Sequence, residues 1–116
     1  MVNPQDFDAQ DAAPYEPTEE EIAQMRASSQ EEREAVQAMV LRECSERWQK
    51  VAKIVGDLLH EFKRTYEHLP VAYLQATMQK LEDLGKVEIA GDVWAMRYSE
   101  IRLAQSIQSA PTVLSV

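Results

Sequence analysis

The sequence predicts a mainly α-helical fold with one small β-hairpin near its end, which is an α+β class. Apolar residues recur every three or four positions over residues 30–66 and 70–84, the spacing of a helix with one buried face. Residues 86–103 alternate instead, around a Gly-Asp pair that is typical of a tight hairpin turn. A chain of 116 residues that is 45% hydrophobic has room for one packed core.

Both ends of the chain have a composition that does not favour packed structure. Residues 1–16 combine prolines and acids without a helical or strand period, so we expect a flexible acidic arm. Residues 104–116 are mostly small and polar around one proline, so we expect a flexible tail. A single domain over residues 17–103 lies between them.

Two start signals predict an N-terminal helical extension. Thr18 is followed three residues later by Glu21, the spacing of a capping box, which predicts a short helix over residues 19–27. Ser28 and Ser29 are each followed by a glutamate at the same distance. A second, longer helix therefore begins here.

The helical stripe after this second start is longer than most globular helices. It runs over residues 30–66 without a proline, whereas about 8 to 20 residues is usual. Ser45 offers a second cap and Gly56 is a weak interior position, so the stripe is either one helix or two that meet near Ser45. Cys44 and Trp48 lie on the stripe, and we expect both in the core, with Trp48 as an anchor.

Pro70 and Gly85 delimit the next helix. Proline is well tolerated in a first helical turn, and glycine is the preferred residue after a last turn, so the pattern predicts a helix over residues 70–84. Residues 86–90 then alternate as a strand.

The second strand of the hairpin is predicted over residues 93–103, after the Gly-Asp turn. Trp94, Met96 and Tyr98 fall on one face of that strand, but the residues after them switch to the other face. This switch predicts a bulge or break near Ser99.

Helix, turn, helix, glycine, strand, turn and strand is the skeleton of a winged helix-turn-helix. The stretches RWQKVAKIVGDLL and LEDLGKVEIAGDVWAMRYSEIRL resemble the C-terminal winged-helix-like domain of a bacterial family of unknown function, which closes on an Arg-x-Ser-Glu-Val-Arg-Leu strand. The matching positions are Trp48, Val51, Ala52, Val55, Gly56, Leu81, Leu84, Gly85, Gly91, Arg97, Ser99, Glu100, Ile101, Arg102 and Leu103. The resemblance implies a winged-helix-like domain over about half the chain and no known activity.

Net charge argues against nucleic acid as the partner. The chain carries −8 at pH 7, with twelve acids against three arginines in residues 1–46 and nine cations against eight acids in residues 47–116. Phosphate backbones are repelled by such acidity, whereas nucleic-acid readers normally present a basic face.

The alternative function is a DNA-binding transcription regulator that uses helix 70–84 and the hairpin 86–102. Helix 70–84 has one cation and, as amides, only Gln75 and Gln79, which is little for base readout. A polar cluster could serve either recognition or structure, with Glu100 holding Arg102 or Arg97 in the structural interpretation. Its members are Lys80, Lys86, Arg97, Glu100 and Arg102.

No catalytic constellation is visible in the sequence. His60, His68 and Cys44 do not reach the number or spacing of a zinc site, and the isolated glycines form no phosphate loop. We therefore expect no enzyme activity, cofactor or metal. A single cysteine and an N-terminus without a basic start or apolar run favour the cytoplasm. Uncharged stretches are shorter than the roughly 18 apolar residues of a membrane helix.

The remaining hypothesis is a protein-interaction or regulatory module, with a homodimer as one form of it. Amphipathic helices before residue 44 carry more apolar residues than a small domain covers easily. The expected partner surface is Met25, Val36, Met39 and Val40. The acidic arm could mask that surface or attract a basic partner.

Overall fold

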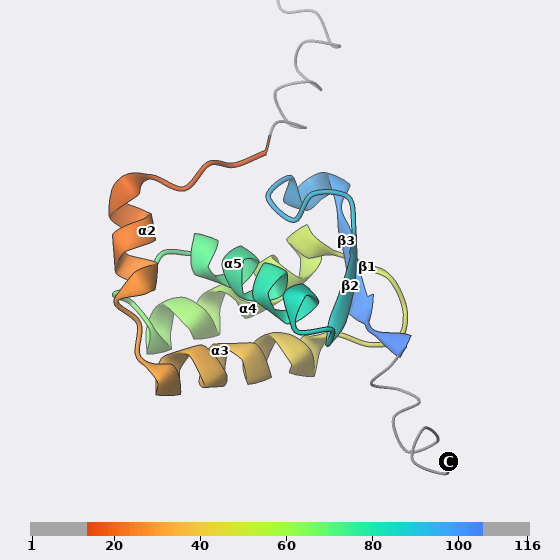
Figure 1. The fold of residues 1–116 in the computed structure, drawn as a ribbon, viewed down its shortest axis with the longest axis horizontal. Coiled ribbons are helices and arrows are strands. Elements are labelled where there is room, and N and C mark those ends of the chain that lie inside the picture. Colours follow the sequence, from red (N-terminus) through yellow and green to blue (C-terminus); the bar gives the residue numbers. More distant parts are fainter. Residues whose placement is uncertain (1–13, 106–116) are drawn as a thin grey trace, which may run out of the picture.

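Helices and a three-stranded antiparallel sheet build the part of the chain that the structure describes, residues 14–105 of a computed structural model (Figure 1). The helices are α2 (Glu19–Arg26), α3 (Gln30–Glu43), α4 (Val51–Thr65) and α5 (Ala72–Asp83). The strands are β1 (Gln49–Lys50), β2 (Val87–Ala90) and β3 (Glu100–Leu103), with a short 3₁₀ helix η1 (Met96–Tyr98) before β3. The predicted α+β class is confirmed.

Capping boxes begin α2 and α3, as the sequence predicts. The Thr18 hydroxyl accepts a hydrogen bond from the backbone N–H of Glu21 at 3.1 Å, and the Glu21 carboxylate accepts one from the Thr18 N–H. Ser29 and Glu32 repeat this arrangement. Ser29 is thus the cap of α3, whereas Ser28 is buried.

The long apolar stripe forms two helices, with a strand between them that the sequence does not predict. α3 ends at Glu43, and β1 pairs antiparallel with β3, placing Gln49 opposite Ile101. Ser45 lies in the connecting turn, where its carbonyl accepts a hydrogen bond from the Leu103 N–H at 2.7 Å. Because the partner of β1 lies about fifty residues away in the chain, no local pattern marks this strand.

The prediction that Trp48 anchors the core is wrong. Trp48 is 40% exposed, because it lies in the segment before β1 and not on a helix. The Arg102 guanidinium lies 4.5 Å from the centroid of its ring, a cation–π contact at the surface.

α5 starts two residues later and ends one residue earlier than the predicted helix over residues 70–84. Gly85 takes a φ of 76°, and the N–H groups of Gly85 and Lys86 donate to the carbonyls of Glu82 and Leu81, both at 2.9 Å. This pair of bonds is a Schellman motif, which a glycine adopts without steric cost.

The predictions of a tight Gly-Asp turn and of a long second strand over residues 93–103 are wrong. After β2 the chain forms a loop and η1, and β3 begins only at Glu100, so the predicted break near Ser99 marks the start of the strand. Val93 is buried and its carbonyl accepts a hydrogen bond from the Gln75 side chain at 3.0 Å. Contacts with α5 therefore override the alternating pattern.

The core lies between α3, α4, α5 and the inner face of the sheet. β3 is the central strand, in the order β1-β3-β2. The largest fully buried side chains are Phe62, Ile54, Leu58, Leu74, Met78, Leu81, Ile101, Val36, Val40, Val51, Val93 and Ser99. Within residues 14–105, every buried side-chain nitrogen or oxygen has a hydrogen-bond partner.

Most of the predicted arm and tail, residues 1–13 and 106–116, lies outside the described residues. Tyr15 is described, and its N–H donates to the Trp94 carbonyl at 2.9 Å. Ala104 is buried, and its N–H donates to the Lys86 carbonyl at 3.1 Å.

Alanine at Gly91 should destabilise the fold, whereas alanine at Gly56 should not. Gly91 has a φ of 87°, and an added Cβ would lie 2.9 Å from the Tyr98 carbonyl oxygen. We expect a loss of about 1–3 kcal/mol in the free energy of unfolding, measured with urea. Gly56 lies within α4 with open space around it, so Gly56→Ala should gain up to about 1 kcal/mol. Equal effects of the two changes would contradict this account of the loop.

Candidate functional site

α5 does not present free amides to a nucleic acid. The Gln75 side chain is buried and donates to the Val93 carbonyl. The Gln79 amide donates to the Glu82 carboxylate at 2.8 Å. Lys80 is exposed. The residues that base readout would need are thus already used within the domain.

The predicted polar cluster is divided among separate places. Arg102 donates to the Glu88 carboxylate across the β2–β3 pair, at 2.6 Å. Glu100 stands opposite Lys50 of β1. Arg97 lies in η1 and lines a cavity beside α5, while Lys80 lines a different groove. The expectation that Glu100 holds Arg102 is corrected, since Glu88 is the carboxylate that pairs with it.

Lys86 is exposed and lies directly before β2. Its carbonyl oxygen joins the sheet by accepting the Ala104 N–H. Its position is set by the cap of α5, since Lys86 directly follows Gly85. The backbone of Lys86 is therefore structural, and its side chain is left at the surface.

The predicted apolar partner surface is wrong for Val36, Met39 and Val40. Val36 and Val40 are completely buried, Met39 is 7% exposed, and Met25 is partly buried against the same core. α3 packs against both α4 and α5, so the apolar face of α3 is covered by the chain itself. The argument for a homodimer through these residues is lost with it.

A groove between α2 and α5 combines apolar and cationic side chains and has a volume of about 460 Å³. We call it the α2–α5 groove. In Figure 1, α2 stands beside the first turns of α5. The lining side chains are Ile22, Met25, Arg26, Ser28, Arg33, Gln37, Tyr73, Ala76, Thr77 and Lys80. Among the described residues, no carboxylate lines it.

The floor of the α2–α5 groove is held by a chain of hydrogen bonds. The buried Tyr73 hydroxyl donates to the Ser28 hydroxyl at 2.8 Å, which donates to the Met25 carbonyl at 2.7 Å. Arg33 donates to the Ser28 carbonyl at 2.7 Å and to the Gln30 side chain at 3.1 Å. The turn between α2 and α3 thereby fixes both the floor and one cation of the rim.

Sequence reasoning missed this groove. Arg26 ends α2, Arg33 lies in the first turns of α3, and Lys80 is in the last turn of α5. Nothing in their spacing along the chain places them together. The one available signal is that the front of the chain has few cations, and two of its three arginines flank the turn at Ser28.

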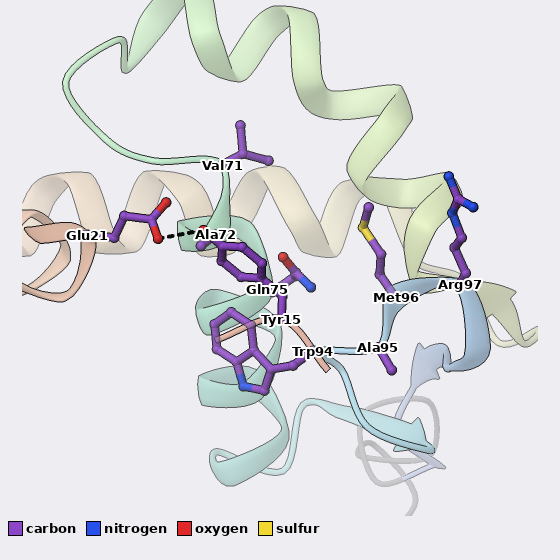
Figure 2. A pocket seen from close by; sticks show the side chains of 9 residues that line it. All are labelled: Tyr15, Glu21, Val71, Ala72, Gln75, Trp94, Ala95, Met96 and Arg97. Carbon is purple, nitrogen blue, oxygen red and sulfur yellow. Dashed lines mark hydrogen bonds between the residues drawn. The ribbon is translucent and has the colours of Figure 1, made fainter. Parts of the chain in front are cut away.

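A second cavity of about 300 Å³ lies at the other end of α2 (Figure 2). Tyr15 and Trp94 supply its aromatic side chains, and Glu21 and Arg97 supply its charges. The Tyr15 hydroxyl donates to the Glu21 carboxylate at 2.7 Å, drawn dashed in Figure 2. This carboxylate also accepts the Thr18 N–H.

These bonds lower the pKa of Glu21, first through the Thr18 N–H and then through Tyr15. The same contact raises the pKa of Tyr15. Glu21 is therefore held ionised as a structural acceptor, and is not a carboxylic acid poised to give up a proton.

The remaining reactive side chains are dispersed. His68 bonds to the Glu32 carboxylate at 2.6 Å, and His60 is exposed on α4. Within residues 14–105, no three His, Cys, Asp or Glu side chains gather to hold a metal ion. None of the described helices is long and apolar enough to cross a membrane.

Cys44 is buried after α3, and burial, followed by the nearby Glu43 charge, raises the pKa of its thiol to about 11. A nucleophilic cysteine needs the opposite shift, because the thiolate is the reactive form. The predicted role of Cys44 as a small buried hydrophobe agrees with this environment.

No protein-family model matches the chain, and neither a curated protein nor a solved structure matches it. The α2–α5 groove is therefore the feature on which a function has to be argued.

Cys44 should react slowly with iodoacetamide in the folded protein. With a pKa of about 11, roughly one thiol in a thousand is ionised at pH 8. Mass spectrometry should show little alkylation until urea unfolds the chain. Burial of the neutral Cys44 thiol also makes the free energy of unfolding depend on pH. The stabilisation is complete below about pH 9 and is lost as the pH rises through about 11. Rapid alkylation of the folded chain at pH 8 would contradict this.

Proposed function

We propose that this chain is a non-catalytic protein-interaction module, on a winged-helix-like scaffold, that binds a peptide segment in the α2–α5 groove. One observation carries the proposal. Three cations, Arg26, Arg33 and Lys80, stand around a partly apolar hollow in a chain whose net charge is −8. Such local reversal of the overall charge is a feature of binding surfaces for acidic partners.

The lining determines the chemistry of the partner. Ile22, Met25 and Ala76 offer an apolar surface in contact with water, since each is only partly buried. An apolar side chain of the partner would displace that water, and carboxylates beside it would meet the cations of the rim. Arg is suited to this because its planar guanidinium matches a carboxylate. The expected ligand is a large apolar residue flanked by Asp or Glu.

The scaffold part of the proposal is supported by the order of the elements. α4, α5, β2 and β3 follow one another as helix, helix, strand and strand, with Gly85 ending α5. This is the skeleton that the resemblance to the bacterial winged-helix-like family implies. In this module, α2 stands beside α5, the helix that a DNA-binding winged helix would expose to DNA.

DNA binding is the alternative, because the same cations flank α5 and could meet phosphates. It would use residues 70–84 with the 86–102 hairpin. Two observations argue against DNA binding. The amides of Gln75 and Gln79 already donate hydrogen bonds within the domain, and the net charge of the chain is acidic. Phosphate contacts alone would give binding without sequence preference.

A fluorescent peptide with phenylalanine flanked by aspartates should bind the full chain, and its lysine-flanked counterpart should not. Fluorescence anisotropy measures both. Arg26→Glu combined with Lys80→Glu should weaken the aspartate peptide at least about fivefold, since two attractive contacts become repulsive. Lys63→Glu combined with Arg64→Glu is the matched control, because both residues are exposed on α4 and neither lines the groove.

The same variants should be titrated with duplex DNA at low salt. Binding of DNA that the double variant abolishes, without peptide binding, would replace the proposal by the alternative. Absence of both would leave the groove without this function. Equal weakening by the groove variant and by the Lys63→Glu, Arg64→Glu control would show an effect of total charge only.

A further inference from the structure

We infer that the α2–α5 groove is occupied in the resting chain by the chain's own segment Asp6-Phe7-Asp8. The inference rests on the proposed function and adds its regulation, since a partner peptide must then displace the arm. It makes the arm an intramolecular competitor for the site.

Chemical complementarity is the first argument. Phe7 is a large apolar residue with an aspartate on each side, and Asp11 follows shortly after. The groove offers Met25 and Ile22 as apolar surface and Arg26, Arg33 and Lys80 as cations. The segment therefore has the composition that the groove selects, an apolar side chain between carboxylates.

The other end of the chain does not fit the groove. Residues 106–116 carry no acidic side chain, so no side chain of this segment can form an ion pair with the cations of the rim. The cavity near Tyr15 suits the acidic segment less well, because its one cation, Arg97, is accompanied by the ionised Glu21, whereas three cations and, among the described residues, no carboxylate line the α2–α5 groove. The α2–α5 groove is the better match for both reasons.

The tether is long enough. Tyr15 is fixed by its hydrogen bonds to Trp94 and Glu21, and Glu21 is one helical turn before Met25 of the groove. That turn rises about 6 Å. The eight residues from Phe7 to Tyr15 span up to about 26 Å when extended. The arm can therefore turn back along α2 and reach the groove.

Attachment gives the arm an advantage over a free peptide. A short tether holds a segment near its site at an effective concentration in the millimolar range. Even a weak contact of Phe7 is then populated. A free ligand has to compete with it, so the apparent affinity of the groove for other peptides is lowered while the arm is in place.

The test compares the full chain with an arm variant that carries Asp6→Lys, Phe7→Ala and Asp8→Lys. The probe is a fluorescent peptide of residues 2–12, VNPQDFDAQDA, read by anisotropy. The arm variant should bind this probe at least about threefold more tightly than the unchanged chain, because the competitor is gone. Adding Arg26→Glu and Lys80→Glu to the arm variant should abolish that gain.

A change in the arm outside the Asp6-Phe7-Asp8 segment is the matched control. Val2→Lys, Asn3→Lys, Gln10→Lys and Ala12→Lys together add the same charge as the arm variant and leave Asp11 unchanged, so they should leave most of the competition in place. An equal gain from this control would attribute the effect to charge alone and overturn the inference.

Two-dimensional amide NMR of the full chain gives a second readout. Phe7→Ala should shift the amide signals of Ala76, Thr77 and Lys80, and it should have no such effect when Arg26→Glu and Lys80→Glu are present. Unmoved signals would overturn the inference. Shifts that depend on protein concentration would also overturn it, because they would assign the groove to the arm of a second copy.

The two proposals fail in different ways. Probe binding that is equal for the unchanged chain and the arm variant, and that requires Arg26 and Lys80, would reject arm docking and keep the groove as a peptide site. Absence of probe binding even to the arm variant would reject the peptide site itself.

Discussion

The burial of α5 is the constraint on which the rest of the structure depends. Seven of its twelve residues are buried, including the polar Gln75 and Thr77, so α5 is surrounded on most sides (Figure 1). α3 and α4 cover its apolar face, the loop before η1 covers Gln75, and the turn after α2 covers Tyr73. A helix so enclosed has only a narrow surface left, and the α2–α5 groove lies along it.

Local structure can be predicted from the sequence where the stabilising contacts join residues that are close together in the chain. The capping boxes at Thr18 and Ser29 and the left-handed Gly85 are predicted correctly, because each involves residues at most five apart. β1 and the loop at Val93 are not predictable in this way. Gln49 pairs with Ile101, and Val93 meets Gln75, so the stabilising contact lies far away in the chain and leaves no periodic trace.

The candidate site is still less predictable than the fold. The apolar period of α3 identifies Val36 and Val40 correctly as one face, but it does not say which surface covers that face. Here it is the domain's own core. The groove depends on the angle between α2 and α3, fixed by Ser28, Arg33 and Tyr73. Side chains from three helices meet only once that angle is set, so composition predicts an acidic surface and misses the cationic hollow.

Charge separation in this chain favours recognition at short range. At physiological salt, exposed charges interact over about 8 Å, so the cations of the groove act on groups that already touch it, while the net charge of −8 repels acidic molecules farther away. A long polyanion such as DNA meets the repulsion along much of its length. A short acidic segment meets it only briefly and then gains apolar contact with Met25 and Ile22. The same reasoning favours a segment tethered to the domain, because attachment replaces the long-range attraction that the overall charge does not provide.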